Sequence, residues 1–158
     1  MTLMTLLLLA STANPSIDYD HEVDFSRYQT WSWSEGVTHA MDATTDKRIR
    51  EAIEGGLAAR GLSRVDKDAA LLVVYHASKT GQVDLTPVGK GASANTTGIQ
   101  YTEKGTLVME MRDASSRHVV WRGFVTGVLR YGPPEIEAQV KAAVDALLAN
   151  FPPSHPGS

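Results

Sequence analysis

The segment AALLVVYH, residues 69–76, is a continuous apolar run that ends at a histidine. A run of this length, with two adjacent valines, predicts a central strand of a sheet that is covered at least in part on both faces. Tyr75 and His76 close the run, where a binding group can sit, so both are candidate binding residues. A strand-end histidine that is satisfied locally or faces solvent is the alternative.

The composition changes sharply after this strand. Between Ser78 and Gly98 the residues are mostly Gly, Ser, Thr, Lys and Asn. Twenty structureless residues are unusual in a compact domain, so we predict either a flap or a long hairpin connection. We expect this segment and the neighbouring strand edges to form the contact surface, with Lys90 as a candidate binding residue. The glycines at 89–93 lack the spacing of a phosphate-binding loop.

Residues 101–112 and 119–130 predict two long strands, and the turn-like link 113–117 between them predicts a hairpin. Side chains repeat every two residues along a strand. We therefore expect Leu107, Met109 and Met111 on one face of the first strand, and Val119, Trp121 and Val125 on one face of the second. Trp121 and the adjoining Arg122 are further candidate binding residues. We expect all three tryptophans, Trp31, Trp33 and Trp121, in the core, and an aromatic platform for a ligand is the alternative.

Residues 45–60 predict a helix, because Ile49, Ile53 and Leu57 recur at helical spacing. Asp42 or Thr45 can cap its start, and Gly61 can supply a left-handed stop. Proline at the first helical position predicts that a second helix opens at Pro133.

Two shorter strands, at 16–20 and 29–33, precede the first helix, and Asp24 is expected to cap the turn between them. The resulting order is β-β-α-β-β-β-α. It predicts an α+β fold, with a mainly antiparallel sheet of five or six strands and two helices packed on one face. Gly123 and Gly127, within the last strand, leave room for a helix or a bend.

A set of short segments occurs in a fixed order along the chain: Asp18 to Asp20, Asp24 to Tyr28, Thr30 to Trp33, Arg48 to Ile53, Ala58 to Leu62, Ala70 to His76, Gly105 to Val108, Val119 to Gly123, and a closing helix ending at Phe151-Pro152. Together they resemble the bacterial domain-of-unknown-function 4136 family, a family of predicted lipoproteins. The resemblance covers nearly everything from about Ile17 onward. It implies an envelope protein of a Gram-negative type of bacterium, usually lipid-anchored, and it implies no activity.

The chain opens on an apolar stretch, Leu3 to Ala10, followed by the small residues Ser11 to Ala13. This pattern is typical of a secretory signal peptide, and an apolar first strand or helix in the core is the alternative. No Lys or Arg precedes Arg27, so we expect that the true start lies upstream or that Met1 is not the start. Ser11 stands where a lipoprotein signal has its lipidated cysteine. We therefore expect export, with the lipid anchor lost.

Composition and motifs argue against several classes of function. The net charge is −3 with scattered Lys and Arg, so nucleic acid is not an expected partner. The chain has no cysteine, which excludes disulfides and thiolate sites. No apolar run approaches the ~20 residues of a membrane-spanning helix. We find no Gly-x-Ser-x-Gly elbow and no Ser-x-x-Lys motif with its partners, and we expect no cofactor.

Acidic residues and histidines give only weak indications of metal binding. Asp18, Asp20, Glu22 and Asp24 alternate and form a conceivable part of a calcium site, with a solvated strand edge as the alternative. His21, His39, His76, His118 and His155 show neither helical pairing nor zinc-like clustering, so we assign no metal site. We expect His118 to be exposed.

The sequence thus predicts a signal-peptide-like segment at 1–13, a single α+β domain at 16–153 and a flexible tail at 154–158. The leading hypothesis is a non-catalytic domain, periplasmic or associated with the outer membrane, that binds an unknown envelope protein or a small ligand. A purely structural role in the envelope is a further possibility. The alternative is a hydrolase in which His76 works with a carboxylate such as Asp68 or Asp84.

Overall fold

The computed structural model describes residues 14–35, 42–88, 96–130 and 132–153. The apolar run starts the central strand β4 (Leu71–Val88). Leu71, Val73 and Tyr75 are at most 1% exposed, whereas the alternating Leu72 and Val74 are half-buried. One face of this strand is therefore fully covered and the other only in part.

Six strands form one sheet in the order β1-β6-β5-β4-β2-β3. The other strands are β1 (Ser16–Tyr19), β2 (Thr30–Trp33), β3 (Ser63–Arg64), β5 (Thr96–Asp113) and β6 (Val119–Val128). The pairs β1–β6, β4–β5 and β5–β6 are antiparallel, while β2 pairs in parallel with β3 and β4. The predicted α+β class and mainly antiparallel sheet are confirmed. The parallel pairs arise because a helix connects β2 to β3 and β4.

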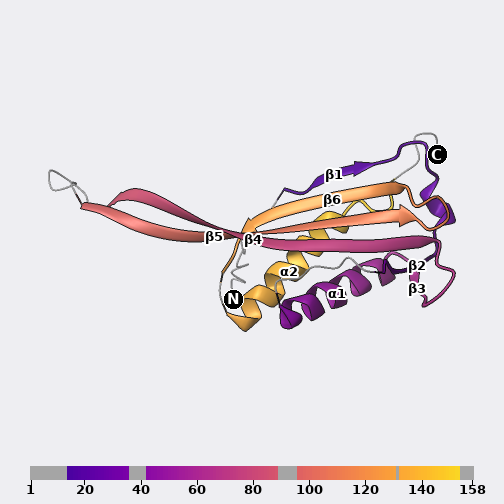
Figure 1. Ribbon diagram of the computed structural model, residues 1–158, viewed down its shortest axis with the longest axis horizontal. Coiled ribbons are helices and arrows are strands. Elements are labelled where there is room, and N and C mark those ends of the chain that lie inside the picture. The colour runs from indigo at the N-terminus through magenta and orange to yellow at the C-terminus, as the bar shows by residue number, and fades with distance from the viewer. Residues whose placement is uncertain (1–13, 36–41, 89–95, 131, 154–158) are drawn as a thin grey trace, which may run out of the picture.

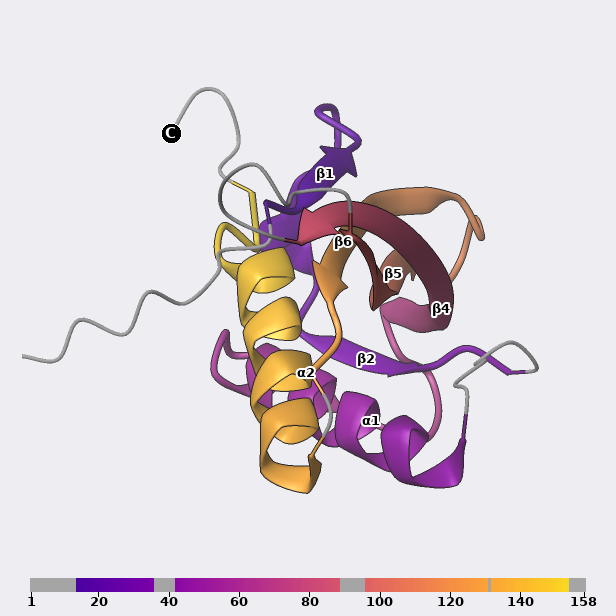
Figure 2. The ribbon, with the colours of Figure 1, turned by 90° about the vertical axis from the view of Figure 1, so that its left-hand side faces the viewer.

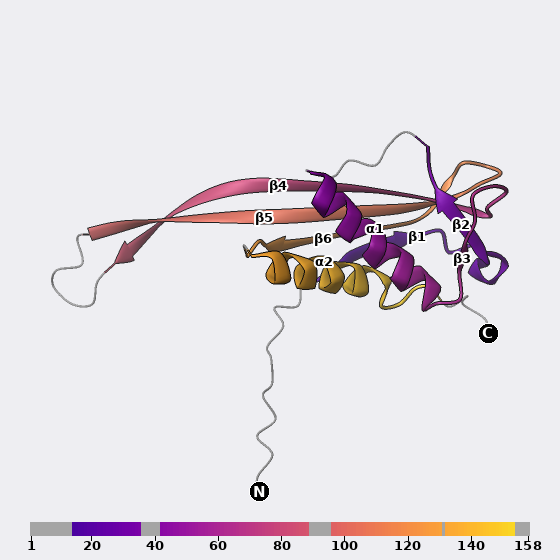
Figure 3. The same cartoon turned by 90° about the horizontal axis from the view of Figure 1, so that it is seen from below.

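Two helices, α1 (Ala43–Ala58) and α2 (Pro133–Leu148), lie side by side on one face of the sheet (Figures 2 and 3). Of the two expected caps for α1, Asp42 is the one that accepts a hydrogen bond from the Thr45 backbone N–H. Gly61 follows the helix with a φ of +82°. A Cβ on Gly56 would lie 2.7 Å from Leu148 Cδ1, so glycine lets the two helices approach closely. No helix in the described ranges is long and apolar enough to cross a membrane.

Strands β4 and β5 pair without interruption from Leu71–Asp113 to Val88–Thr96. Strand β6 accompanies β5 only as far as the pair Lys104–Val128. Beyond that pair the two strands continue alone and project from the body (Figure 1). We call residues 80–88 and 96–103 the arm. Of the two predictions for the segment 78–98, the long hairpin is confirmed for the described part, and Lys90 lies outside the described residues.

The predicted burial of Val119 is wrong. Val119 is 37% exposed, while its neighbour Val120 is only 3% exposed. The cause is an irregularity in the ladder: Met111 pairs with Trp121 but Arg112 pairs with Val119, so one extra residue is inserted on β6. The alternation therefore shifts by one position there, and Trp121 and Val125 face the core as expected.

A buried aspartate ties the N-terminal part of the chain to the β5–β6 turn. Asp113 is 6% exposed, and its Oδ1 accepts hydrogen bonds from the backbone N–H groups and hydroxyls of Ser115 and Ser116. Its Oδ2 accepts hydrogen bonds from Arg27 Nη2 at 2.5 Å and from the Tyr28 hydroxyl at 2.8 Å. The Ser115 hydroxyl and the Ser116 N–H, with Tyr28, hold the pKa of Asp113 well below its usual range.

We predict that Asp113→Asn lowers the free energy of unfolding at pH 7 by about 1.5–3 kcal/mol, the worth of a charged hydrogen bond. Because the pKa of Asp113 is lowered in the folded state, its stabilisation is present above the unfolded pKa of about 3.9 and disappears as the pH falls below it. Urea unfolding should therefore show a smaller difference between variant and wild type at pH 2.5 than at pH 7. Asp145→Asn, in an exposed pair with Lys141, is the control and should cost at most about 1 kcal/mol. An equal difference at both pH values would contradict the assignment.

Candidate functional site

The structure separates the predicted binding residues onto two faces of the sheet. Tyr75 and Trp121, each 1% exposed, lie on the face that the helices cover. His76 and Arg122, one position further along their strands, are exposed on the opposite face, which we call the open face. Adjacent residues on a strand point to opposite sides of the sheet, so these four predicted binding residues do not form one site.

Tyr75 fastens helix α1 to the sheet. Its hydroxyl donates a hydrogen bond to Asp46 Oδ1, and Asp46 Oδ2 accepts another from Arg50 Nε at 2.9 Å. The Arg50 guanidinium lies 4.8 Å from the ring centroid of Trp33. Burial and the bond to Asp46 raise the pKa of Tyr75; burial opposes ionisation of Asp46, but bonds from Tyr75 and Arg50 outweigh it and lower the pKa of Asp46. This phenol is thus a fixed structural donor.

The open face carries a small ionic cluster centred on Glu110. Glu110 Oε2 accepts from Arg112 Nη2 at 3.0 Å, and Oε1 lies 2.7 Å from Arg122 Nη2. Beside it is a shallow hollow of about 220 Å³, which His76 and Ser34 also line. His76 and Arg122 therefore do share a face, with Glu110 paired to the arginine.

His76 and Asp84, one of the two predicted acid–base pairs for hydrolysis, lie too far apart for direct proton transfer. His76 and Asp84 both lie on β4, and eight positions along a strand correspond to roughly 26 Å. Asp68 precedes the first residue of β4, whereas His76 lies toward the middle of the strand. Proton transfer requires hydrogen-bond distance between the groups or one bridging water, and the separation of His76 from Asp84 exceeds both.

Two of the alternating acidic residues near the N-terminus stabilise turns by accepting backbone hydrogen bonds. Asp20 Oδ1 accepts a hydrogen bond from the Glu22 N–H, and Asp24 Oδ1 accepts from Ser26 as the cap of a short 3₁₀ helix (Phe25–Arg27). Within the described ranges, no three His, Asp or Glu side chains converge as metal ligands. His118 is exposed, as expected, while His39 and His155 lie outside the described residues.

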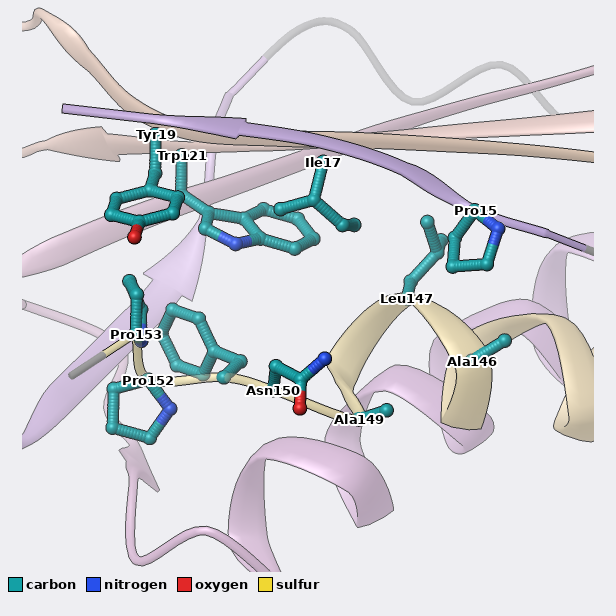
Figure 4. A pocket seen from close by; sticks show the side chains of 11 residues that line it. Pro15, Ile17, Tyr19, Trp121, Ala146, Leu147, Ala149, Asn150, Pro152 and Pro153 are labelled. Atoms are coloured by element: carbon teal, nitrogen blue, oxygen red, sulfur yellow. The ribbon is translucent and has the colours of Figure 1, made fainter. Parts of the chain in front are cut away.

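A groove of about 670 Å³ lies between β1 and the C-terminal end of α2 (Figure 4). Ile17 and Tyr19 come from β1, Trp121 from β6 and Leu147 from α2. The remaining lining residues are Pro15, Ala146, Ala149, Asn150, Phe151, Pro152 and Pro153. Ile17 is 38% exposed, so apolar surface is accessible at this groove. Of these lining residues, the sequence predicted only Trp121 as a binding residue, because β1 and the end of α2 are over a hundred residues apart in the chain.

Gly123 creates the space in which the groove residues meet. A Cβ at this position would lie 2.7 Å from Trp121, 2.8 Å from Ile17 and 2.9 Å from Leu147. Real Cβ atoms do not approach so closely, so only glycine allows these three side chains to converge. The sequence signal was Gly123 itself, which predicted room for a helix or a bend.

The arm presents a second apolar surface. Val83 and Tyr101 are cross-strand partners and are 59% and 62% exposed. The Tyr101 hydroxyl donates to Glu103 Oε1 at 2.9 Å, and this bond raises the pKa of Tyr101. Two residues further along, the register pairs Leu85 with Ile99. Since a two-stranded ribbon is at best marginally stable in water, an arm that exposes the Val83–Tyr101 pair is suited to contact another molecule.

These features define an α+β domain with a projecting hairpin, a groove and ion pairs that serve the fold. A family model for a domain of unknown function, DUF4136, matches residues 15–153, and the chain belongs to this family. No curated protein matches the chain in sequence.

Solved structures share the fold at low sequence identity. A DUF4136 family protein from Bacteroides thetaiotaomicron is 13% identical with a TM-score of 0.55, covering 89% of this chain and 94% of that one. The PelC dodecamer from Paraburkholderia phytofirmans is 12% identical with a TM-score of 0.54, covering 85% and 95%. A PDZ domain protein from Parabacteroides distasonis is 14% identical with a TM-score of 0.60; the match covers 90% of this chain but only 36% of that one. These likenesses establish the fold.

We predict that Gly123→Ala lowers the free energy of unfolding by about 1–3 kcal/mol, because the added methyl group must displace Trp121, Ile17 or Leu147. The matched control is Gly127→Ala on the same strand, where a Cβ would meet nothing within 4 Å. That control should be neutral or slightly stabilising. Urea unfolding of both variants, followed by tryptophan fluorescence, measures the difference; equal stabilities would contradict the close packing at Gly123.

Proposed function

We propose that this chain is an exported, non-catalytic domain of the bacterial cell envelope, periplasmic or associated with the outer membrane, and that it binds a protein partner through the arm. The observation that carries the proposal is the arm itself, with Val83 and Tyr101 more than half exposed at one cross-strand pair. Apolar side chains on an unsupported ribbon are costly in water unless a partner covers them.

Three observations support a protein as the partner. Among the described residues, no third strand pairs with the arm, since β6 stops at Lys104 and β2 pairs with β4 only from Leu71 to Val73; the Glu103 carbonyl alone accepts a bond, from the Leu129 N–H. Free strand edges and apolar side chains are what β-strand addition between proteins uses. In addition, one protein of this fold, PelC, is a dodecamer. Export is supported by the signal-peptide-like pattern of residues 1–13, and a bacterial envelope by the family resemblance.

The arm can be removed without touching the body. In the test variant, residues 81–103 are replaced by Asn-Gly, which closes the hairpin between Thr80 and Lys104 with a tight turn. We predict that this variant keeps the wild-type circular dichroism spectrum and loses at least tenfold of the partner cross-linked by the intact chain in the native host. The control variant Phe124→Lys changes an exposed residue of the body and should retain the cross-link. Unchanged cross-linking by the shortened variant would rule out the arm.

Export has its own test. We predict that the protein isolated from its native host fractionates with the envelope and that its mass lacks residues 1–13. Intact-mass spectrometry of the purified protein and of each cell fraction measures both properties. A cytoplasmic protein that retains Met1 through Ala13 would contradict the envelope assignment, whatever the outcome for the arm.

A further inference from the structure

Strand β4 has a long free edge where it leaves the body and enters the arm (Figure 1). Among the described residues, β2 pairs with β4 only from Leu71 to Val73, whereas β4 continues to Val88. Every residue from Ser78 to Val83 is exposed. The edge of such a strand presents backbone N–H and C=O groups with which another chain can pair.

Two hydrogen bonds show which residues present their backbone groups at this edge. The Ala70 carbonyl accepts a bond from the Ala114 N–H on the β5 side, and the Val73 carbonyl accepts one from the Ser34 N–H on the β2 side. Successive residues of a strand direct their backbone groups to opposite edges, and the β4–β5 register has no break. The odd-numbered residues of β4 therefore face away from β5. In the exposed segment and directly before it, these outward residues are Ala77, Lys79, Gly81 and Val83.

This edge lacks the usual protection of an edge strand. Edge strands are commonly short, bulged, or guarded by charges and proline. Strand β4 has 18 residues and pairs with β5 without a bulge, and no described residue bonds to the backbone groups of the four outward residues. Between Lys79 and Pro87 the only charged residue is Asp84. Pro87 is itself at an outward position, where it has no N–H to donate, so we expect pairing to stop there.

Apolar side chains lie at the same edge. Val83 is 59% exposed, and its cross-strand partner Tyr101 is 62% exposed. A Cβ on Gly81 would collide with the Tyr101 hydroxyl, so the Tyr101 side chain reaches across to β4 and lies over Gly81. A strand added beside β4 would place alternate side chains on this face, next to Val83 and the Tyr101 ring.

The chemistry of the edge specifies the class of its occupant. Its donors and acceptors repeat every two residues, roughly 6.8 Å, and an extended polypeptide carries complementary groups at the same spacing. Lys79 Nζ lies 3.9 Å from Glu103 Oε2, which is too far for a hydrogen bond. The Lys79 ammonium can therefore pair with a carboxylate of an added strand, and Val83 can pack against an apolar side chain of that strand.

A second copy of the same edge is a poor match for these requirements. The outward residues up to Pro87 include no acid, so no antiparallel pairing of two β4 edges places a carboxylate directly opposite Lys79. The free edge supplies a branched aliphatic neighbour for Val83, namely Val83 or Leu85, only in registers that place Pro87 opposite Lys79 or Gly81. Proline removes a ladder hydrogen bond in those registers.

We propose that the free edge of β4, from Ala77 to Val83, accepts an extended strand of a different protein, with an acidic residue beside Lys79 and an apolar residue beside Val83. This inference rests on the proposed function and names the partner's binding element. Main-chain hydrogen bonds supply affinity in this mode of binding, and the side chains beside Lys79 and Val83 supply specificity.

Proline tests the backbone bonds separately from the side chain. Because the Lys79 N–H points away from β5, Lys79→Pro removes a donor from the free edge and leaves the β4–β5 ladder intact. The matched control is Lys79→Ala, which removes the same side chain and keeps the N–H. In the native host, cross-linking of the partner should fall about tenfold for Lys79→Pro, as expected for one or two lost hydrogen bonds. For Lys79→Ala it should fall at most about threefold, the worth of an exposed ion pair.

Amide hydrogen exchange locates the added strand. In the free chain, the amides of Gly81 and Val83 should exchange quickly, whereas those of Ser78 and Thr80, which face β5, should be protected. In the complex purified through the cross-link, exchange at Gly81 and Val83 should slow by about tenfold or more, while Ser78 and Thr80 stay unchanged. Retained protection of Thr80 in the Lys79→Pro chain shows that this variant keeps the hairpin.

Three results would overturn the inference. In the first, a folded Lys79→Pro chain cross-links like the wild type, or Lys79→Ala loses as much as Lys79→Pro. In the second, binding protects the Tyr101 amide in place of Gly81 and Val83, so that the strand adds to β5. In the third, mass spectrometry identifies the cross-linked partner as a second copy of this chain.

These failures are distinct from failure of the proposed function. If replacement of residues 81–103 abolishes cross-linking while Lys79→Pro has no effect, the arm remains the binding element and only the edge of β4 is ruled out. If the same replacement leaves cross-linking unchanged, the proposed function and this inference both fail.

Discussion

The uninterrupted pairing of β4 with β5 is the constraint on which the rest of the structure depends. The same two strands form the centre of the sheet and then the arm. A slip of one residue in their register would turn either Tyr75 or Met109, both now buried, to the open face. Burial beneath the helices therefore fixes the register for the whole hairpin. The orientation of Val83 and Tyr101 on the arm is set by packing at the other end of the same strands.

Several carboxylates of the body accept hydrogen bonds from other elements and so connect segments that are distant in the sequence. Asp113 joins the β5–β6 turn to Arg27 and Tyr28, and Asp46 joins α1 to Tyr75. On the exposed side of α1, Glu54 accepts hydrogen bonds from the Trp33 indole and from Arg64. Each of these carboxylates sits where elements distant in the sequence meet. Charged groups arranged in this way serve the architecture, which agrees with the absence of an assembled acid–base pair at His76 and Asp84.

The parts of the fold that follow from local physics could be predicted from the sequence. The apolar run at 69–75 predicted the central strand. Asp24 was predicted to cap the turn between β1 and β2, and Gly61 was predicted to end the first helix. The outer half of the hairpin could not be assigned uniquely, because Gly, Thr and Pro separate its few apolar residues and are as typical of a loop as of a strand. Val119 was placed on the wrong face because one inserted residue shifts the alternation. The groove could not be predicted because its lining residues come from β1, β6 and the end of α2, which are far apart in the sequence and meet only after folding.

The most strongly perturbed titratable groups of the described residues lie inside the body. Here the two strongest perturbations fall on Tyr75 and Asp113, both buried within structural hydrogen bonds. Large hydrophobic side chains are also exposed on the described surface, among them the Val83–Tyr101 pair on the arm and Ile17 at the groove. The uninterrupted β4–β5 ladder determines the direction in which the Val83–Tyr101 pair points, because alternate residues of a strand lie on the same face.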